Sequence, residues 1–241
     1  MGDEEMIFSP TGGLSYHLRA FRYKRNLWSP FISQVHSEIQ SWKSPGKALL
    51  LIGPNAGYSL PLSYLSQWEK IEVLEPDPIA RFFLKKKLGL FSYNSRDFFF
   101  DLEDESMDYQ IVHLFEEYSD YDWIFCNFLG QLQSLYPESK KEIHPHWIKT
   151  FQDLLLKKNH WFSYHDLFSA PQKPKIEAID SQKFISYDDF IRRVYSTERE
   201  TLYINDHQTW KLFEPFPLEE RRWASWEIHP AYTHIIEFRH G

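Results

Sequence analysis

Two glycines and an acid stand at the spacing that a nucleotide-binding site needs. Gly53 and Gly57 lack a Cβ, so their backbone N–H groups can meet a polar ligand at the start of a helix. Glu75 follows the first glycine by about 20 residues, where a carboxylate accepts hydrogen bonds from the two hydroxyls of a nucleotide's ribose. The spacing predicts a cofactor site that contains Gly53, Asn55, Gly57, Glu75 and Asp77.

Short buried strands are expected to position these residues. Leu49 to Ile52 is an apolar run that ends at the first glycine, and Ile71 to Leu74 is a second run that ends at the acid. Continuous apolar runs of this length are typical of strands buried on both faces of a parallel sheet. A helix from Leu60 to Trp68 is expected to connect them, which makes a βαβ unit.

This unit resembles the class I S-adenosylmethionine-dependent methyltransferases. The segment from Gly53 to Gly57 stands where that family has its glycine-rich motif, and Glu75 stands where it has its ribose-binding acid. Asn55 replaces the middle glycine, and Leu51 and Ile52 occupy places where the family has an acid. The resemblance implies a Rossmann-like, doubly wound α/β fold with a mostly parallel sheet of about seven strands. It also implies S-adenosylmethionine as the cofactor and a methyl acceptor as the partner.

Three other interpretations of the turn stay open. A phosphate-binding P-loop needs a lysine where Tyr58 stands, and the segment is one residue short between its glycines. A dinucleotide site needs glycines where Asn55 and Tyr58 stand. The glycines can also serve turn geometry alone, in a non-catalytic Rossmann-like interaction protein that has lost cofactor binding.

An acid-rich segment supplies a further cofactor candidate. Between Arg96 and Asp122 there are ten acids and one base, which disfavours binding of phosphates. Tyr109 to Phe115 is expected to be the third strand. That assignment places Glu116 at the carboxyl edge of the sheet, where it can meet the adenine amino group of the cofactor.

Candidate substrate residues follow two later strands. Asp122 to Phe128 is predicted as the fourth strand and brings Asn127 to the sheet edge. His160 to Tyr164 is predicted as the fifth strand, so that Tyr164 and the following His165 reach the same edge. His165 has a pKa range suited to proton transfer. No catalytic base is identified from the sequence.

Metal binding is not expected from the local sequence. Cys126 is the single cysteine of the chain, which excludes an internal disulfide and a cysteine-rich zinc site, and its apolar neighbours indicate a buried strand thiol. His144 and His146 flank a proline at the start of a predicted helix from Pro145 to Lys158, but the sequence shows no third ligand near them.

The remaining segments suggest a cap and one α/β domain. Residues 1–45 are expected to form an N-terminal helical cap, and residues 46–241 the methyltransferase-like domain with an elaboration at about 167–217. A helix is predicted from Tyr187 to Tyr195 within that elaboration. Ala224 to Ile228 and Tyr232 to Phe238 are predicted to form a terminal antiparallel hairpin.

Composition limits the partners. The chain has 241 residues and a formal net charge of -7, which gives no general basic surface for nucleic acid. An acidic N-terminus and the absence of a long apolar stretch suggest a soluble, cytoplasmic protein without a membrane partner. A small molecule and a protein side chain are equally open as methyl acceptors, and the sequence gives no oligomeric state.

Overall fold

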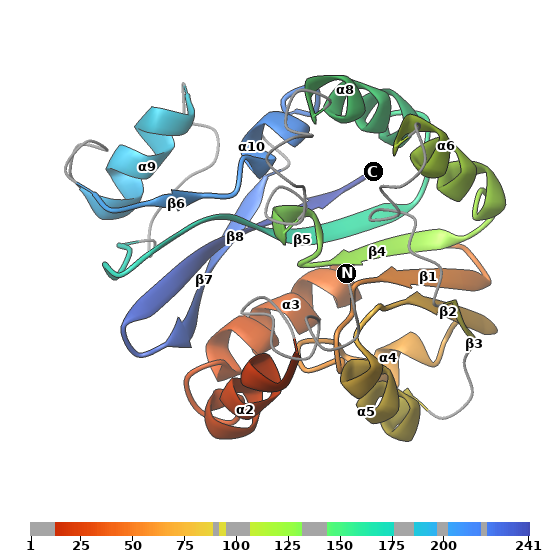
Figure 1. Ribbon diagram of the computed structural model, residues 1–241, viewed down its shortest axis with the longest axis horizontal. Coiled ribbons are helices and arrows are strands. Elements are labelled where there is room, and N and C mark those ends of the chain that lie inside the picture. Colours follow the sequence, from red (N-terminus) through yellow and green to blue (C-terminus); the bar gives the residue numbers. More distant parts are fainter. Residues whose placement is uncertain are drawn as a thin grey trace.

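A mixed β-sheet with helices on both faces organises the protein (Figure 1). The computed structural model describes residues 13–88, 92–94, 107–131, 144–175, 186–196, 202–217 and 221–241. The strands are β1 (Ala48–Ile52), β2 (Lys70–Leu74), β3 (Ser92–Asn94), β4 (Asp122–Cys126), β5 (Trp161–Ala170), β6 (Asn205–Asp206), β7 (Arg222–His229) and β8 (Tyr232–His240). Among the helices in these ranges, none is long and apolar enough to cross a membrane.

The strand order confirms the predicted fold class. The main path of the sheet is β3-β2-β1-β4-β5-β8-β7, and the short β6 pairs with β5. The first five strands of this path are parallel, whereas β8 and β7 run antiparallel and form the predicted terminal hairpin. The chain passes from β3 at one end of the sheet back to β4 beside β1. In doubly wound sheets, ligands bind at the carboxyl ends of the strands beside such a reversal.

Helices cover the two faces in separate groups (Figure 1). The helices are α2 (Gly13–Tyr23), α3 (Ser29–Ser41), α4 (Leu62–Leu65), α5 (Pro78–Leu88), α6 (Met107–Glu117), α8 (His144–Leu155), α9 (Tyr187–Tyr195) and α10 (Thr209–Leu212), with a 3-10 turn η1 (Leu129–Gln131). The first four of them lie on one side of the sheet, and α6, α8 and α10 lie on the other. The predictions for α8 and α9 are confirmed to within a few residues at each end.

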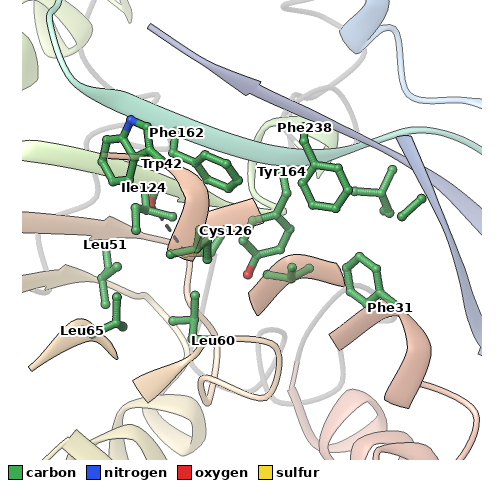
Figure 2. Close-up of a cluster of buried hydrophobic side chains, with 14 of the residues drawn as sticks. Phe31, Trp42, Leu51, Leu60, Leu65, Ile124, Cys126, Phe162, Tyr164 and Phe238 are labelled. Carbon is green, nitrogen blue, oxygen red and sulfur yellow. Dashed lines mark hydrogen bonds between the residues drawn. The ribbon is translucent and has the colours of Figure 1, made fainter. Parts of the chain in front are cut away.

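Alternate residues of the central strands supply the two apolar cores. Leu51 and Ile124 face the α3 and α4 side, where Figure 2 shows them with Phe31, Trp42 and Leu60. Their chain neighbours Leu50, Ile52, Trp123 and Phe125 face α6 and α8. Successive side chains of a strand point to opposite faces, which explains the continuous apolar runs. Each fully buried leucine of β1 stabilises the fold by about 1.5–3 kcal/mol.

The strand predicted from Tyr109 to Phe115 was wrong, because this segment is helix α6 and the third strand is β3. Ile111, Leu114 and Phe115 recur at helical spacing and are buried against the sheet. The Phe115 ring lies 4.5 Å from that of Trp123 on β4, and α6 also packs against α8. A short apolar run fits a strand or a helix equally well, and packing on β4 selected the helix.

Two other boundaries differ from the prediction. The helix expected from Leu60 to Trp68 shortens to the single turn α4, because Pro61 has a non-helical ψ of 73° and the Trp68 indole instead donates to the Asp122 carboxylate at 2.9 Å. Strand β5 does not end at Tyr164 but continues to Ala170. The antiparallel partner β8 runs beside it over that whole length, which satisfies its backbone hydrogen bonds.

Candidate functional site

The turn after β1 is built from three residues with left-handed backbone conformation. Gly53 and Gly57 both have a φ of +63°, and Asn55 between them has a φ of +50°. Glycine adopts this region without steric cost, and asparagine tolerates it better than most side chains. Asn55 therefore satisfies the backbone requirement at the place where the resembled family has its middle glycine, and its side chain accepts a hydrogen bond from the Ala56 N–H at 2.7 Å.

The two glycines are also required by close packing. A Cβ on Gly53 would lie 2.9 Å from Phe128, which follows β4, and a Cβ on Gly57 would lie 2.8 Å from Leu84 on α5. The prediction from sequence was that the backbone N–H groups of these two glycines meet a polar ligand. In the structure, Phe128 and Leu84 pack in the Cβ directions, and both N–H groups already have partners: Gly53 donates to the Leu74 carbonyl at 2.8 Å and Gly57 to the Pro54 carbonyl at 3.0 Å.

Glu75 joins the ends of β1 and β2. Its carboxylate accepts a hydrogen bond from the Asn55 N–H at 2.6 Å and another from the Asp77 N–H at 3.0 Å. Burial of this carboxyl group raises its pKa to about 7, helped by the nearby Asp77 charge and opposed by the two N–H donors. The acid predicted to bind ribose is therefore held rigidly beside the glycine turn at the carboxyl edge of the sheet.

Asp77 fixes the start of α5 and contacts α2. One carboxylate oxygen accepts from the Ile79 N–H at 2.8 Å, and the other lies 3.2 Å from Nε2 of His17. The opposite nitrogen of that imidazole is hydrogen-bonded to the Tyr58 hydroxyl at 2.8 Å. Burial acts to raise the pKa of Asp77, but the hydrogen bonds from His17 and from backbone N–H groups hold it below its ordinary value.

His17 and Tyr58 were not identified from the sequence. They connect α2 on the N-terminal segment to the glycine turn and to α5, although they lie 41 residues apart in the chain. Lys87 lies 4.4 Å from the centre of the Tyr58 ring, and burial together with Lys24 lowers the pKa of its ammonium group to about 8. No neighbouring residue in the sequence distinguishes His17 from an ordinary surface histidine, so its contacts with distant residues could not be predicted.

Asn127 lies directly after β4, and Tyr164 on β5 contacts the segment that follows the glycine turn. Asn127 follows β4 with a φ of +54°, and its amide donates to Asp166 at 3.2 Å and accepts from the Asp166 N–H at 2.9 Å. The Tyr164 hydroxyl is hydrogen-bonded at 2.8 Å to Ser59, two residues after Gly57. Figure 2 shows this ring on the same side of the sheet as Leu60. Burial raises the pKa of Tyr164 well above its usual range.

The position expected for His165 was wrong. Because β5 continues past it, His165 lies inside the sheet with no exposed surface and on the face opposite to Tyr164. Its Nε2 lies 3.2 Å from the Glu237 carboxylate, which also lies 3.2 Å from the Arg221 guanidinium, and its ring stacks on Phe213. Burial lowers the pKa of His165 despite the Glu237 partner. These contacts describe a buried structural network.

Glu116 does not lie at the predicted edge either. It is exposed in the last turn of α6 and lines a cavity of about 560 Å³ together with Pro45, Gly46, Asp120 and Asp122. Those residues precede β1 or begin β4, so the cavity lies at the amino ends of the strands. The cofactor contact proposed for Glu116 required a strand that is a helix in the structure, and it is withdrawn.

Asp166 lies at the centre of a second group of polar residues. Its carboxylate lies 3.1 Å from Nδ1 of His234 on β8, and His207, which follows β6, lies beside them. Burial opposes the ionised form of Asp166, but the two histidines and Asn127 hold the pKa of its carboxyl group below the ordinary value. Within the described residues, these three side chains form one set that could hold a metal ion.

The sheet order and the turn define a Rossmann-like, doubly wound α/β protein with an antiparallel terminal hairpin. No family model matches the sequence, and no curated protein matches it either. Solved structures with a similar chain course include a DhpI complex with SAH, at 12% identity and a TM-score of 0.44 over 99% of this chain and 97% of that one.

Two further structures cover the chain to a similar extent. A SAM-dependent methyltransferase from Anabaena variabilis has 12% identity and a TM-score of 0.45 over 94% of this chain and 93% of its own. Magnesium protoporphyrin IX methyltransferase from Synechocystis, with bound SAM, has 11% identity and a TM-score of 0.41 over 98% of this chain and 88% of its own. Structural similarity with TM-scores this low carries no argument about function. The functional proposal therefore rests on the strand order and on the residues at the sheet edge.

Proposed function

We propose that this protein binds S-adenosylmethionine at the carboxyl ends of β1 and β2 and transfers its methyl group to a small-molecule or protein acceptor. The observation that carries the proposal is the position of Glu75, which is buried at the end of β2 and hydrogen-bonded to the turn that holds Gly53 and Gly57. This is the place where doubly wound folds accept a nucleoside.

The donor and acceptor groups at this edge fit a nucleoside. Among the described contacts, each oxygen of Glu75 accepts one backbone hydrogen bond, and a carboxylate has about four lone-pair sites in all. The remaining sites suit the two ribose hydroxyls. In the proposal, Gly53, Asn55 and Gly57 line the cofactor from the turn, and Asp77 supports it from the start of α5.

The acceptor side of the proposal comprises Asn127 and Tyr164. S-adenosylmethionine supplies an electrophilic methyl group, whose carbon bonds to the acceptor as the bond to sulfur breaks and leaves the electron pair on sulfur. Much of the rate of such a transfer comes from proximity and alignment of the two reactants. Asn127 and Tyr164 are held by hydrogen bonds to Asp166 and Ser59, which suits them for orienting an acceptor.

The proposal assigns the helical cap to residues 1–45, whose described helices are α2 and α3, and the catalytic α/β domain to residues 46–241. His17 ties α2 to Tyr58 and Asp77, so movement of this helix would open the turn. The segment from about 167 to 217 is assigned as an elaboration of the domain. His165 and Glu116 are not part of the proposed site.

Titration calorimetry with S-adenosylmethionine and S-adenosylhomocysteine tests the proposal, with NAD and ATP as control ligands. We expect selective binding of the first two. Glu75→Gln keeps the shape of the side chain but removes its charge, and we expect it to weaken binding roughly 10- to 100-fold, because hydrogen bonds to a charged group are worth about 1.5–3 kcal/mol each. Glu69→Gln, at an exposed ion pair with Lys47, serves as the matched control.

Absence of binding would overturn the proposal and support the alternative of a non-catalytic interaction protein. The specific observation that favours this alternative is the packing of Phe128 and Leu84 against the two glycines. In that case the turn needs glycine for its φ angles and for close packing alone, and Glu75→Gln would change stability without changing the affinity for any nucleoside.

A further inference from the structure

We propose that Asp166, His207 and His234 form a binding site for a divalent transition-metal ion beside the acceptor end of the proposed active site. The three side chains come from β5, from the segment after β6 and from β8, and each offers one ligand atom within 4.8 Å of the others. Ligand atoms around tetrahedral Zn²⁺ lie about 3.3 Å apart, so small ring and carboxylate rotations bring the set to coordination distance.

An irregularity in the sheet brings the three residues together. The register of β5 with β8 shifts between Asp166 and Phe168, which leaves Leu167 as an extra residue on β5. Ser169 therefore pairs with His234, and its hydroxyl lies 3.3 Å from Nε2 of His207. Bulges of this kind often redirect side chains next to active sites. Here the bulge places Asp166 and Ser169 on the same face as His234.

Two of the three residues already have the supporting contacts that metal ligands show. Nδ1 of His207 is hydrogen-bonded to the backbone carbonyl of Gly130 at 2.9 Å, and the second oxygen of Asp166 accepts from the Asn127 amide at 3.2 Å. Metal-binding histidines almost always donate their other ring N–H to such a partner, which fixes the ring. A Cβ on Gly130 would lie 2.8 Å from that of Asp166, so glycine permits this close approach.

Two buried atoms at the centre of the cluster are left without a hydrogen bond. Oδ1 of Asp166 and Nδ1 of His234 lie 3.1 Å apart, but their alignment does not make a hydrogen bond, and both atoms are shielded from solvent. Buried polar groups nearly always have a partner, and an exception calls for one such as an ion. Two ligand atoms that converge without a hydrogen bond between them are expected where both bind the same metal ion.

The ligand set selects the class of metal. Two imidazoles and one carboxylate suit Zn²⁺ or Fe²⁺, whereas Mg²⁺ and Ca²⁺ prefer sites made of oxygen atoms. Three protein ligands leave at least one coordination position for another molecule. Asn127, which contacts Asp166, stands at the end of β4 where the proposed acceptor binds.

The role of the metal rests on the proposed methyl transfer, although metal binding itself does not. A hydroxyl or phenol oxygen of the acceptor in the open position would lose its proton to solvent more readily, because the metal ion stabilises the anion. That oxygen then bonds to the methyl carbon as the carbon–sulfur bond breaks and its electrons stay on sulfur. The geometry therefore favours an acceptor that is methylated on oxygen.

Calorimetry with ZnCl₂ on the full chain, stripped with a chelator and free of cofactor, tests the site. We expect one equivalent to bind in the micromolar range or tighter. His207→Gln and His234→Gln should each weaken binding at least 10-fold. His240→Gln, which removes an exposed histidine near the end of β8 outside the cluster, should not.

Two readouts keep this test independent of folding and of the cofactor. Co²⁺ bound by imidazole and carboxylate gives visible absorption bands, which should appear in the wild type and in His240→Gln and be lost in the two cluster variants. The wild-type melting temperature should also rise with ZnCl₂. Equal Zn²⁺ affinity in all variants, or no saturable binding to the wild type, would show that Asp166 and His234 form an ion pair only. S-adenosylmethionine affinity, measured separately, tests the function.

Discussion

Glu75 and Asn55 link the ends of two neighbouring strands, because the Glu75 carboxylate accepts a hydrogen bond from the Asn55 backbone N–H at 2.6 Å. The bond lies between the turn after β1 and the tip of β2, where parallel strands end side by side. A single buried carboxylate thus couples the shape of the glycine turn to the group proposed to bind ribose. Its ionisation is therefore expected to affect both folding and binding.

The contribution of Glu75 to the stability of the protein is expected to fall as the pH rises from about 4.5 to about 7. Burial raises the pKa of Glu75 to about 7 in the folded state, whereas the ordinary value of 4.5 applies when the chain is unfolded. Between these values the folded protein keeps a proton that the unfolded chain has released, so the contribution of Glu75 decreases by roughly 3 kcal/mol. Urea unfolding of the wild type at several pH values in this range measures the change in the free energy of unfolding. Glu75→Gln should remove this part of the pH dependence, and an unchanged profile would contradict the assignment.

Tyr58→Phe is expected to destabilise the contact between α2 and the glycine turn. The substitution removes the hydroxyl bonded to His17 and leaves a buried ring nitrogen without this partner, which costs about 1–3 kcal/mol. Tyr203→Phe is the matched control, because that side chain is 73% exposed and should change the free energy of unfolding by less than about 0.5 kcal/mol. Denaturant titration compares the two variants, and equal effects would argue against a role for His17 in holding α2.

Gly53→Ala should destabilise the protein more than Asn55→Ala does. Gly53→Ala places a new Cβ on left-handed backbone, at a cost of about 1–2 kcal/mol, and brings that atom to 2.9 Å from Phe128. Asn55 already carries a Cβ, so Asn55→Ala removes only the hydrogen bond that its side chain accepts from the Ala56 N–H. Thermal or denaturant unfolding of both variants gives the difference. If the losses are equal, Phe128 does not restrict this position as the structure indicates.

Glu237→Gln tests whether the His165 network is structural. Removing the charge leaves the buried Arg221 without its carboxylate partner and is expected to cost about 3–5 kcal/mol. Glu227→Gln removes one side of an exposed pair with Lys173 and should cost less than about 1 kcal/mol. Affinity for S-adenosylmethionine should be unchanged in folded Glu237→Gln, since the network lies on the other face of β5. A selective loss of affinity would return His165 to the site.

Local sequence patterns were sufficient to predict the strands that end at a glycine, at an acid or at a short turn. The apolar run of β1 ends at Gly53, the run of β2 ends at Glu75, and the terminal hairpin has a short turn between its strands. In each case the residues that set the conformation are neighbours in the chain. The strand order that follows from these elements agrees with the predicted fold class.

The sequence by itself therefore determined strands β1 and β2, the glycine turn and the acid beside it. Tertiary structure decided that Tyr109 to Phe115 is helical, because the packing of Phe115 on Trp123 is not visible in a short apolar run. It also decided that His165 is buried and that Asp166 meets two histidines. Both results follow from pairing of β5 with β8, a contact between distant segments whose register no local pattern specifies.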